Sequence, residues 1–175
     1  RVLNCFSYTS AFGVYAAVTS PETHVTSVDV SASALEQARA TFALNGLDPE
    51  RYSFAVEDVF EYLEAAAARG ERYDVVILDP PAFAKSQGAR SQALRAYRRL
   101  NTLGMQALAP GGILLSCSCS GVIGQDDLLG AIAQSAQRVE RQVQLLESFG
   151  HGFDHPINLA MPETAYLKAI FCRVA

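Results

Sequence analysis

Two short stretches of the sequence place chemically active residues at the end of an apolar run. Asp79-Pro80-Pro81 follows Val75–Leu78, and Ser118-Cys119-Ser120-Gly121 closes Ile113–Cys117. The first run is rich in β-branched residues, as in a strand covered on both faces of a parallel sheet, and the prolines end it because they cannot donate to a ladder. Ligands bind at the carboxyl edge of such sheets, so we expect an acid and a thiol to meet there.

Both residue types also have simpler interpretations. Asp79 can cap the helix that follows it. Cys117 lies within the predicted strand and is expected to be a small buried apolar residue, whereas Cys119 lies where that strand meets a turn. The thiolate is the nucleophile in cysteine chemistry, and a turn can hold an exposed, activated thiol. We therefore place the nucleophile at Cys119, although most free cysteines are simply buried.

Length and composition predict a single globular domain. The chain has 175 residues, half of them apolar, and a formal net charge of −4. This size supports a core without disulfides, and no apolar run approaches the ~20 residues of a membrane span. The chain opens on an apolar strand with no leader, so we expect no signal peptide and a missing upstream part. The scattered cysteines indicate a reduced, cytoplasmic protein, and His151 and His155 are expected to be loop residues rather than ligands of a metal.

Alternating patterns predict five β/α units followed by two late strands. The expected fold is a doubly wound, Rossmann-like α/β sheet of seven strands, mostly parallel with an antiparallel terminal strand. Pro110-Gly111-Gly112 is expected to form a tight turn into the fifth strand. The predicted strands are Arg1–Phe6, His24–Val30, Tyr52–Val56, Tyr73–Asp79, Ile113–Cys117, Gln142–Phe149 and Tyr166–Val174, and the later helices are Val59–Arg69, 90–108 and Gln125–Arg141.

The turn after the first strand indicates which cofactor the fold binds. Its small residues allow backbone N–H groups and a helix N-terminus to face a carboxylate or a phosphate. The G-x-G-x-x-G of NAD-binding domains is absent, because only Gly13 is present and Ser10-Ala11 stand where glycine would help. A cofactor without phosphates fits this turn better. Asp29, about 20 residues past the turn at the end of the second strand, is placed to hold ribose hydroxyls.

Positive charge gathers between Asp79 and Asp126, a span without Asp or Glu. Beside the ligand edge this stripe would suit a phosphate backbone, although most charge runs are solvated helix faces and the net charge argues against bulk nucleic-acid binding. The stripe consists of Lys85, Arg90, Arg95, Arg98 and Arg99.

The ordered set of motifs resembles the class I SAM-dependent methyltransferases. More narrowly, the chain resembles the bacterial 5-methylcytosine methyltransferases of large-subunit ribosomal RNA, which carry a PUA domain upstream. That PUA domain is not in this chain, and Ser10-Ala11 stand where the family tends to have Gly-Gly. The motifs are Asn4–Thr9, Ser27-Val28-Asp29, Glu57-Asp58-Val59-Phe60, Asp79–Phe83, Gly111–Leu114 and Ser118-Cys119-Ser120, with Asp154-His155-Pro156, Pro162-Glu163 and Tyr166-Leu167-Lys168 near the end.

The resemblance implies S-adenosyl-L-methionine (SAM) as the cofactor and ribosomal RNA as the partner, with no membrane. The Cys119 thiolate would attack C6 of a cytosine, so that C5 becomes electron-rich enough to take the methyl group. Loss of the C5 proton and of the thiolate would then restore the ring. Asp79 would hydrogen-bond the N3/N4 edge of an unstacked or flipped base, held rigidly by Pro80 and Pro81. Ala82 stands where two-cysteine relatives carry a second cysteine.

The remaining site residues follow from the same resemblance. Phe6, Ser7, Tyr8 and Thr9 would wrap the methionine end of SAM. Asp29 would hold its ribose and Asp58, with Val59 beside it, its adenine, although Asp58 can equally be a helix N-cap. Asp79 borders the cofactor as well. The residues that the resemblance implies on the substrate side are Phe83, Lys85 and Arg95. Phe83 can equally be an ordinary core residue.

Two other functions stay open at this point. One is a guanine-directed RNA methyltransferase of similar fold, which also uses an Asp-Pro-Pro turn but needs no thiol, so that Cys119 would be inert. The other is a non-catalytic module that binds SAM or RNA, for which Ser10-Ala11 is the best support. The oligomeric state is open too, a homodimer included.

Overall fold

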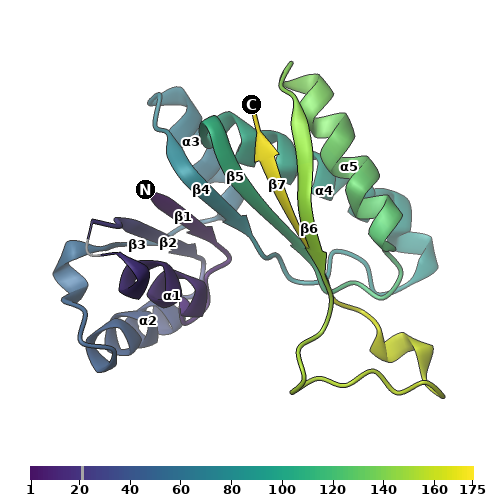
Figure 1. Cartoon of the computed structure of the whole chain (residues 1–175), viewed down its shortest axis with the longest axis horizontal. Helices are drawn as coiled ribbons and strands as arrows, with labels where there is room; N and C mark the ends of the chain where they lie inside the picture. The colour runs from purple at the N-terminus through teal and green to yellow at the C-terminus, as the bar shows by residue number, and fades with distance from the viewer. Residues whose placement is uncertain (21) are drawn as a thin grey trace.

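The computed structural model describes residues 1–20 and 22–175, which form one seven-stranded sheet with helices against it (Figure 1). The strands are β1 (Val2–Cys5), β2 (Val25–Asp29), β3 (Ser53–Val56), β4 (Tyr73–Leu78), β5 (Leu108–Ser118), β6 (Val143–Phe149) and β7 (Lys168–Val174). The helices are α1 (Ala11–Thr19), α2 (Ala32–Leu44), α3 (Val59–Ala68), α4 (Arg90–Ala107) and α5 (Gln125–Arg138), with short 3-10 turns η1 (Pro49–Arg51), η2 (Gln87–Ala89) and η3 (Pro162–Thr164).

The strand order confirms the predicted doubly wound sheet. It runs β3-β2-β1-β4-β5-β7-β6, and β1 to β5 are all parallel. The last strand in sequence, β7, is antiparallel and lies between β5 and β6. The chain winds outward from β1 in both directions, so the strand order switches between β1 and β4. Ligands bind at such a switch point, outside the carboxyl ends of the strands.

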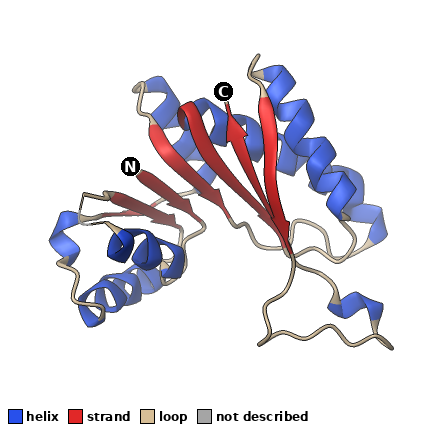
Figure 2. Ribbon diagram, viewed as in Figure 1, coloured by secondary structure: helices blue, strands red, loops and turns tan. Residues whose placement is uncertain are grey.

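The helices lie on two faces of the sheet and create two apolar layers (Figure 2). α3, α4 and α5 pack on one face, against side chains such as Leu3, Leu78 and Leu114. α1 and α2 pack on the other face, against side chains such as Val25 and Ile77. Burying a side chain of this size contributes about 1.5–3 kcal/mol. No helix in the described part of the chain is long and apolar enough to cross a membrane.

The turn predicted before the fifth strand is instead part of that strand. Leu108 pairs with Tyr73, and the register then jumps so that Ile113 pairs with Val75. Residues 109–112 of β5 therefore stand opposite a single residue of β4, as a large bulge. Gly111 makes the bulge possible, because its φ of 79° lies in the left-handed region that favours glycine.

The last helix ends at Arg138 and not at Arg141 as predicted. The physical reason is local, because Glu140 has a φ of 55° and turns the chain away from the helix. Arg141 then donates to main-chain carbonyls at the ends of α4, β5 and β7, those of Met105, Leu108, Ala109 and Val174. The other predicted boundaries agree with the structure to within two residues.

Candidate active site

A pocket of about 480 Å³ opens at the carboxyl edge of the sheet. It brings Asp79, which follows β4, together with Cys119, which follows β5, so the structure joins the two stretches that the sequence singled out. The loop between β6 and β7 lies at the same edge of the sheet (Figure 1), and it contributes residues to the pocket lining. The lining consists of Phe6, Tyr8, Asp79, Pro80, Pro81, Cys119, His151, Gly152, Asp154, His155, Tyr166 and Leu167.

The two neighbouring cysteines have different surroundings. Cys117 is 3% exposed and packs in the apolar layer with Ile77 and Leu115, where burial raises the pKa of its thiol. Cys119 is half-buried, lines the pocket, and its Sγ donates to the Pro80 carbonyl oxygen at 3.8 Å. Only Cys119 of this pair therefore combines access with a position beside Asp79.

The Asp79 carboxyl stands at the base of this pocket, directly after β4. It is half-buried, and burial raises its pKa. Pro80 beside it is buried and Pro81 is exposed, so the stiff dipeptide links the core to the rim. A carboxyl with a raised pKa can be an acceptor when ionised and a donor when protonated.

The turn after β1 is strained in a way that the sequence does not reveal. Phe6, Tyr8 and Ser10 have φ values of 56°, 48° and 60°, in the left-handed region that side chains other than glycine seldom adopt. The end of β2 holds this conformation, because Ser7 N donates to the Val28 carbonyl at 3.1 Å and Tyr8 N donates to Asp29 Oδ2 at 2.9 Å. Strain that is held this firmly is typical of ligand-binding turns.

Ser10, which stands where the resemblance implies a glycine, is held in the turn by its side chain. Its buried Oγ accepts from Asn4 Nδ2 at 3.2 Å and shares a 2.7 Å hydrogen bond with Ser27 Oγ. Gly13 leaves room for this hydroxyl, since a Cβ there would lie 2.2 Å from Ser10 Oγ. The departure at Ser10 is therefore built into the turn by hydrogen bonds to two strands.

The same turn suits the carboxylate, amine and ribose of a nucleoside cofactor such as SAM. Asp29 stands half-buried at the end of β2, and its Oδ1 accepts from Ser31 N at 2.9 Å while its Oδ2 accepts from Tyr8 N. Ser7 Oγ is buried without a hydrogen-bond partner among the described residues, which is costly unless a ligand or water satisfies it. Thr9 is half-buried beside it.

Asp58 and Val59 each have a structural role beside the one that the resemblance implies. Asp58 is the N-cap of α3, and its Oδ1 accepts from Phe60 N at 2.9 Å and Glu61 N at 3.2 Å. The simpler interpretation of Asp58 is therefore what the structure shows, and contact with adenine stays a prediction. The Val59 side chain lies in the core, which leaves only its main chain for a ligand.

The three substrate residues predicted outside the Asp-Pro-Pro turn are not gathered at the pocket. Phe83 belongs to an aromatic cluster, with ring centroids 4.8 Å from Tyr97 and 6.3 Å from Phe60, so it packs as core. Lys85 is exposed on the loop before α4. Arg95 lines a separate hollow of about 670 Å³ between α3, α4 and α5.

The basic stripe is divided because α4 carries most of it away from the carboxyl edge of the sheet. Arg90, the first residue of α4, forms an ion pair with Asp127 in the first turn of α5. Arg99 forms an ion pair with Glu64 at 2.7 Å. Arg98 donates to Gln134 Oε1. The interpretation as a helix face with local partners therefore holds for much of this stripe.

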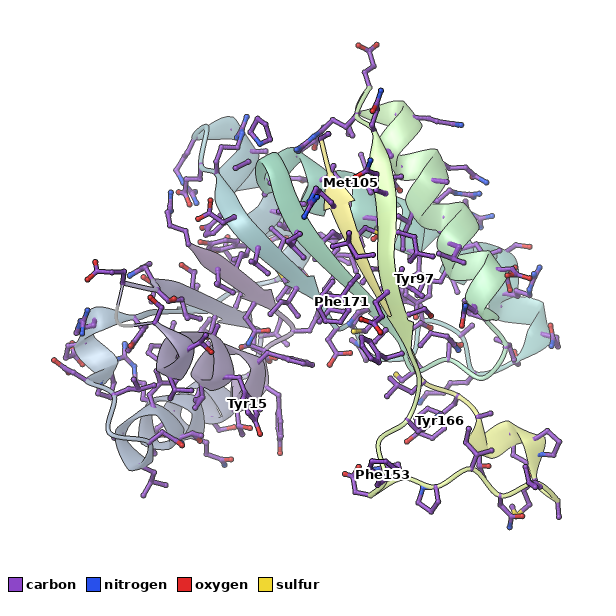
Figure 3. The ribbon with its side chains drawn as sticks, viewed as in Figure 1. Tyr15, Tyr97, Met105, Phe153, Tyr166 and Phe171 are labelled. Atoms are coloured by element: carbon purple, nitrogen blue, oxygen red, sulfur yellow. The ribbon has the colours of Figure 1, made fainter. Side chains whose placement is uncertain are left out.

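A network of buried polar groups around Cys119 escaped the sequence analysis. Tyr97, labelled in Figure 3, donates from its hydroxyl to Ser118 Oγ at 2.9 Å, and burial raises its pKa to about 12. Ser120 Oγ donates to the Ala84 carbonyl at 2.6 Å. Lys168 Nζ donates to the carbonyls of Ser120 and Tyr166. One signal was available, because Lys168 directly precedes the apolar run Ala169–Cys172 of β7.

The loop between β6 and β7 supplies the remaining wall. Leu167 N donates to His151 Nε2 at 3.1 Å. The rings of His151 and Tyr166 pack edge to face, with their centroids 4.6 Å apart. Asp154 Oδ2 and His155 Nδ1 lie 3.1 Å apart. Within residues 1–20 and 22–175, no group of three or more His, Cys, Asp or Glu side chains is arranged to hold a metal ion.

Sequence comparison finds related methyltransferases over nearly the whole chain. A family model of S-adenosylmethionine-dependent methyltransferases matches residues 1–170. The chain is 46% identical over 174 residues to Ribosomal RNA large subunit methyltransferase I of Photobacterium profundum, covering 99% of this chain and 44% of that protein. It is 44% identical over 173 residues to the protein of the same name from Aeromonas salmonicida, covering 99% and 43%. The chain thus spans less than half the length of these relatives.

Solved structures lead to the same family. A methyltransferase complexed with SAH superposes with a TM-score of 0.85 at 28% identity, covering 98% of this chain and 44% of that one. A SAM-dependent methyltransferase from Streptococcus mutans gives the same TM-score and coverage at 27% identity. With the doubly wound sheet and a cofactor turn that fits SAM, these matches show that the chain belongs to the family of S-adenosylmethionine-dependent methyltransferases.

Proposed function

We propose that this domain transfers the methyl group of SAM to C5 of a cytosine in large-subunit ribosomal RNA, with Cys119 as the nucleophile. The observation that carries the proposal is the Cys119 thiol and the Asp79 carboxyl in one pocket at the switch point of the sheet. The names of the curated relatives support a ribosomal RNA substrate. The family resemblance further implies an upstream PUA domain that would help to hold the RNA. The proposed site of action is the cytoplasm.

Cys119 would act by covalent catalysis. Its thiolate adds to C6 of the cytosine, which moves electron density to C5. SAM, when bound, supplies the electrophilic methyl group that C5 takes. Water then takes the C5 proton, the electron pair of that C–H bond forms the C5–C6 double bond, and the sulfur leaves C6 as the thiolate, which regenerates the aromatic ring. The half-buried position of Cys119 beside a pocket gives the sulfur the access that this addition requires.

Asp79 would hold the base while charge moves through the ring. Burial raises its pKa. The carboxyl can donate to N3 when it is protonated and accept from the N4 amino group when it is ionised. Both contacts need the Watson–Crick edge to be free, so the cytosine has to enter unstacked or flipped out. Pro80 and Pro81 restrict the backbone around this carboxyl and so limit its movement.

The cofactor side would use the turn after β1 and the end of β2. Ser7 Oγ and the main chain of the strained turn suit the methionine end, and Asp29 suits the ribose hydroxyls. Asp58 would contact adenine with whatever capacity its capping role leaves. The hydrogen bonds that Ser10 makes count against a decayed site, since they rebuild the turn in place of a glycine.

A pair of cysteine variants tests the proposal. The full-length protein would be incubated with SAM and ribosomal RNA from a strain lacking the gene, and the nucleosides would be measured by mass spectrometry. We expect wild type to form one 5-methylcytidine and Cys119→Ala to lose at least about a thousandfold in rate with unchanged SAM affinity. Cys117→Ala is the matched control, because it removes a thiol two positions away that does not line the pocket.

Three results would contradict the proposal. Full activity in Cys119→Ala would exclude the covalent mechanism. A methylguanosine in place of 5-methylcytidine would indicate the guanine-directed alternative, in which Cys119 is inert. Calorimetry that detects no SAM binding at millimolar concentration would favour the non-catalytic module.

A further inference from the structure

We infer, building on the proposed function, that Lys168 is a positioning residue for Cys119, whose buried ammonium fixes the turn that carries the thiol and stabilises the thiolate. Lys168 opens β7, and it pairs across the sheet with Ser118 at the end of β5. Directly opposed residues of an antiparallel pair have Cα atoms only about 4.5–5.5 Å apart. The lysine is therefore placed by strand register, one residue from the nucleophile.

The ammonium joins two segments of the pocket wall. Lys168 is 8% exposed, and its Nζ donates to the Ser120 carbonyl at 2.6 Å and to the Tyr166 carbonyl at 2.7 Å. Ser120 directly follows Cys119, and Tyr166 lines the same pocket from the loop between β6 and β7. An ammonium has three donors, so one remains beyond these two carbonyls. These two hydrogen bonds of Lys168 thus fix the turn that carries Cys119, and they leave one N–H donor and the positive charge of the ammonium near the thiol.

Within the described part of the chain, this buried charge makes no ion pair with a carboxylate. None of the ion pairs among the described residues includes Lys168. Burial lowers the pKa of its ammonium, while Cys119 and Asp127 act in the opposite direction. Asp127 is already engaged, because its carboxylate accepts from Arg90 and from Gly124 N. Two neutral carbonyls compensate a buried cation only in part, and a thiolate at Cys119 would supply the missing anion.

The other titratable groups around Cys119 do not provide this stabilisation. An ionised Asp79 would oppose a neighbouring thiolate, and burial already raises its pKa. His151 accepts a main-chain hydrogen bond at Nε2, so that nitrogen carries no proton. Among the described residues that line the pocket or interact electrostatically with Cys119 or Lys168, Lys168 is the one Lys or Arg near the thiol. The other titratable groups are Tyr8 after β1, Asp79 after β4, Tyr97 of α4, Cys117 of β5, Asp127 of α5, and His151, Asp154, His155 and Tyr166 of the loop.

The same charge would act at two points of the proposed reaction. Before addition it favours the ionised sulfur over the neutral thiol, and at elimination it favours departure of the sulfur from C6 as thiolate. No further reactant is needed, because the lysine keeps its protons throughout. Lys168 is thus placed to change the rate of both steps without touching the base.

The test measures thiol ionisation directly and needs neither RNA nor SAM. Alkylation of Cys119 by iodoacetamide would be followed by peptide mass spectrometry across pH in the full-length protein. The pH of half-maximal rate is expected to rise by at least about one unit in Lys168→Met, so that alkylation below that pH falls about tenfold. Lys168→Arg, which keeps the charge, should retain most of the wild-type profile. Lys85→Met is the matched control, since it removes the exposed lysine of the chain.

Distinct outcomes overturn this inference and the proposed function. The inference about Lys168 is overturned if the alkylation–pH profile is unchanged in a folded Lys168→Met protein. It is also overturned if Lys168→Arg shifts the profile as much as Lys168→Met does, because geometry and not charge would then matter. If Lys168→Met does not fold, Lys168→Gln is measured in its place against the same two criteria. A shifted profile together with methylated guanine in the RNA experiment would leave the Lys168–Cys119 coupling intact and remove the cytosine mechanism.

Discussion

The turns after β1 and β5 both present reactive or ligand-binding groups at the same edge of the sheet, but they are held in different ways. After β1, three residues with positive φ are held by the adjacent end of β2, through the Val28 carbonyl and the Asp29 carboxylate. After β5, the turn has no such strain and is held by side chains from distant elements. Tyr97 lies 21 positions from Ser118, and Lys168 lies 48 positions from Ser120.

This difference indicates a division of work between the two halves of the sheet. The cofactor turn depends on main-chain shape, which suits a ligand that many related enzymes share. The turn at Cys119 depends on buried polar side chains, which can set the ionisation and direction of one sulfur atom. If the division is real, changes in one turn should leave measurements on the other unaffected.

Among the variants that test whether the two turns are independent, Asp29→Ala should have the largest effect. This variant removes both acceptors that hold Tyr8 N and Ser31 N, as well as the proposed ribose contact, so SAM should bind about a hundredfold more weakly by calorimetry. Alkylation of Cys119 should be unchanged. Asp48→Ala is the matched control, because Asp48 also accepts from a main-chain N–H, that of Glu50, but at η1. A large loss of Cys119 alkylation in Asp29→Ala would show that the two turns are coupled.

A pair of substitutions at Ser10 gives a smaller effect and separates strain from hydrogen bonding. Ser10→Ala keeps the unfavourable φ and loses the bonds to Asn4 and Ser27, which should cost about 1–3 kcal/mol of unfolding free energy. Ser10→Gly loses the same bonds but relieves the backbone, and should be about 1 kcal/mol more stable than Ser10→Ala. Urea unfolding measures both. Equal stability of the two variants would mean that the turn stores no strain.

The sequence predicted the features that depend on short segments. The seven strands, their order of appearance and the meeting of Asp79 with Cys119 follow from apolar runs that end in proline or a small-residue turn. The N-cap interpretation of Asp58 was available for the same reason, since capping involves only the next three residues. The bulge at Gly111 was missed because a glycine pair indicates a turn and a bulge equally well.

Long-range contacts account for what the sequence did not predict. Phe83 was open between a substrate face and core, and only the packing of Phe60 and Tyr97 against it decides for core. Arg95 was placed by its neighbours in sequence, but the direction of α4 carries it to another hollow. Lys168 gained its role from the register of β7 against β5, which no local pattern specifies.

The smallest expected effect sharpens the comparison at the second turn. Tyr97→Phe removes only the hydroxyl that donates to Ser118 Oγ, which still accepts from Ser120 N at 3.3 Å. The loss should cost about 1 kcal/mol of stability and lower kcat a few-fold, with SAM affinity unchanged, because the network loosens only around Cys119. Tyr15→Phe is the matched control, since Tyr15 is exposed on α1. A change in SAM affinity with constant kcat would instead assign Tyr97 to the cofactor half, and the proposed division between the two turns would fail.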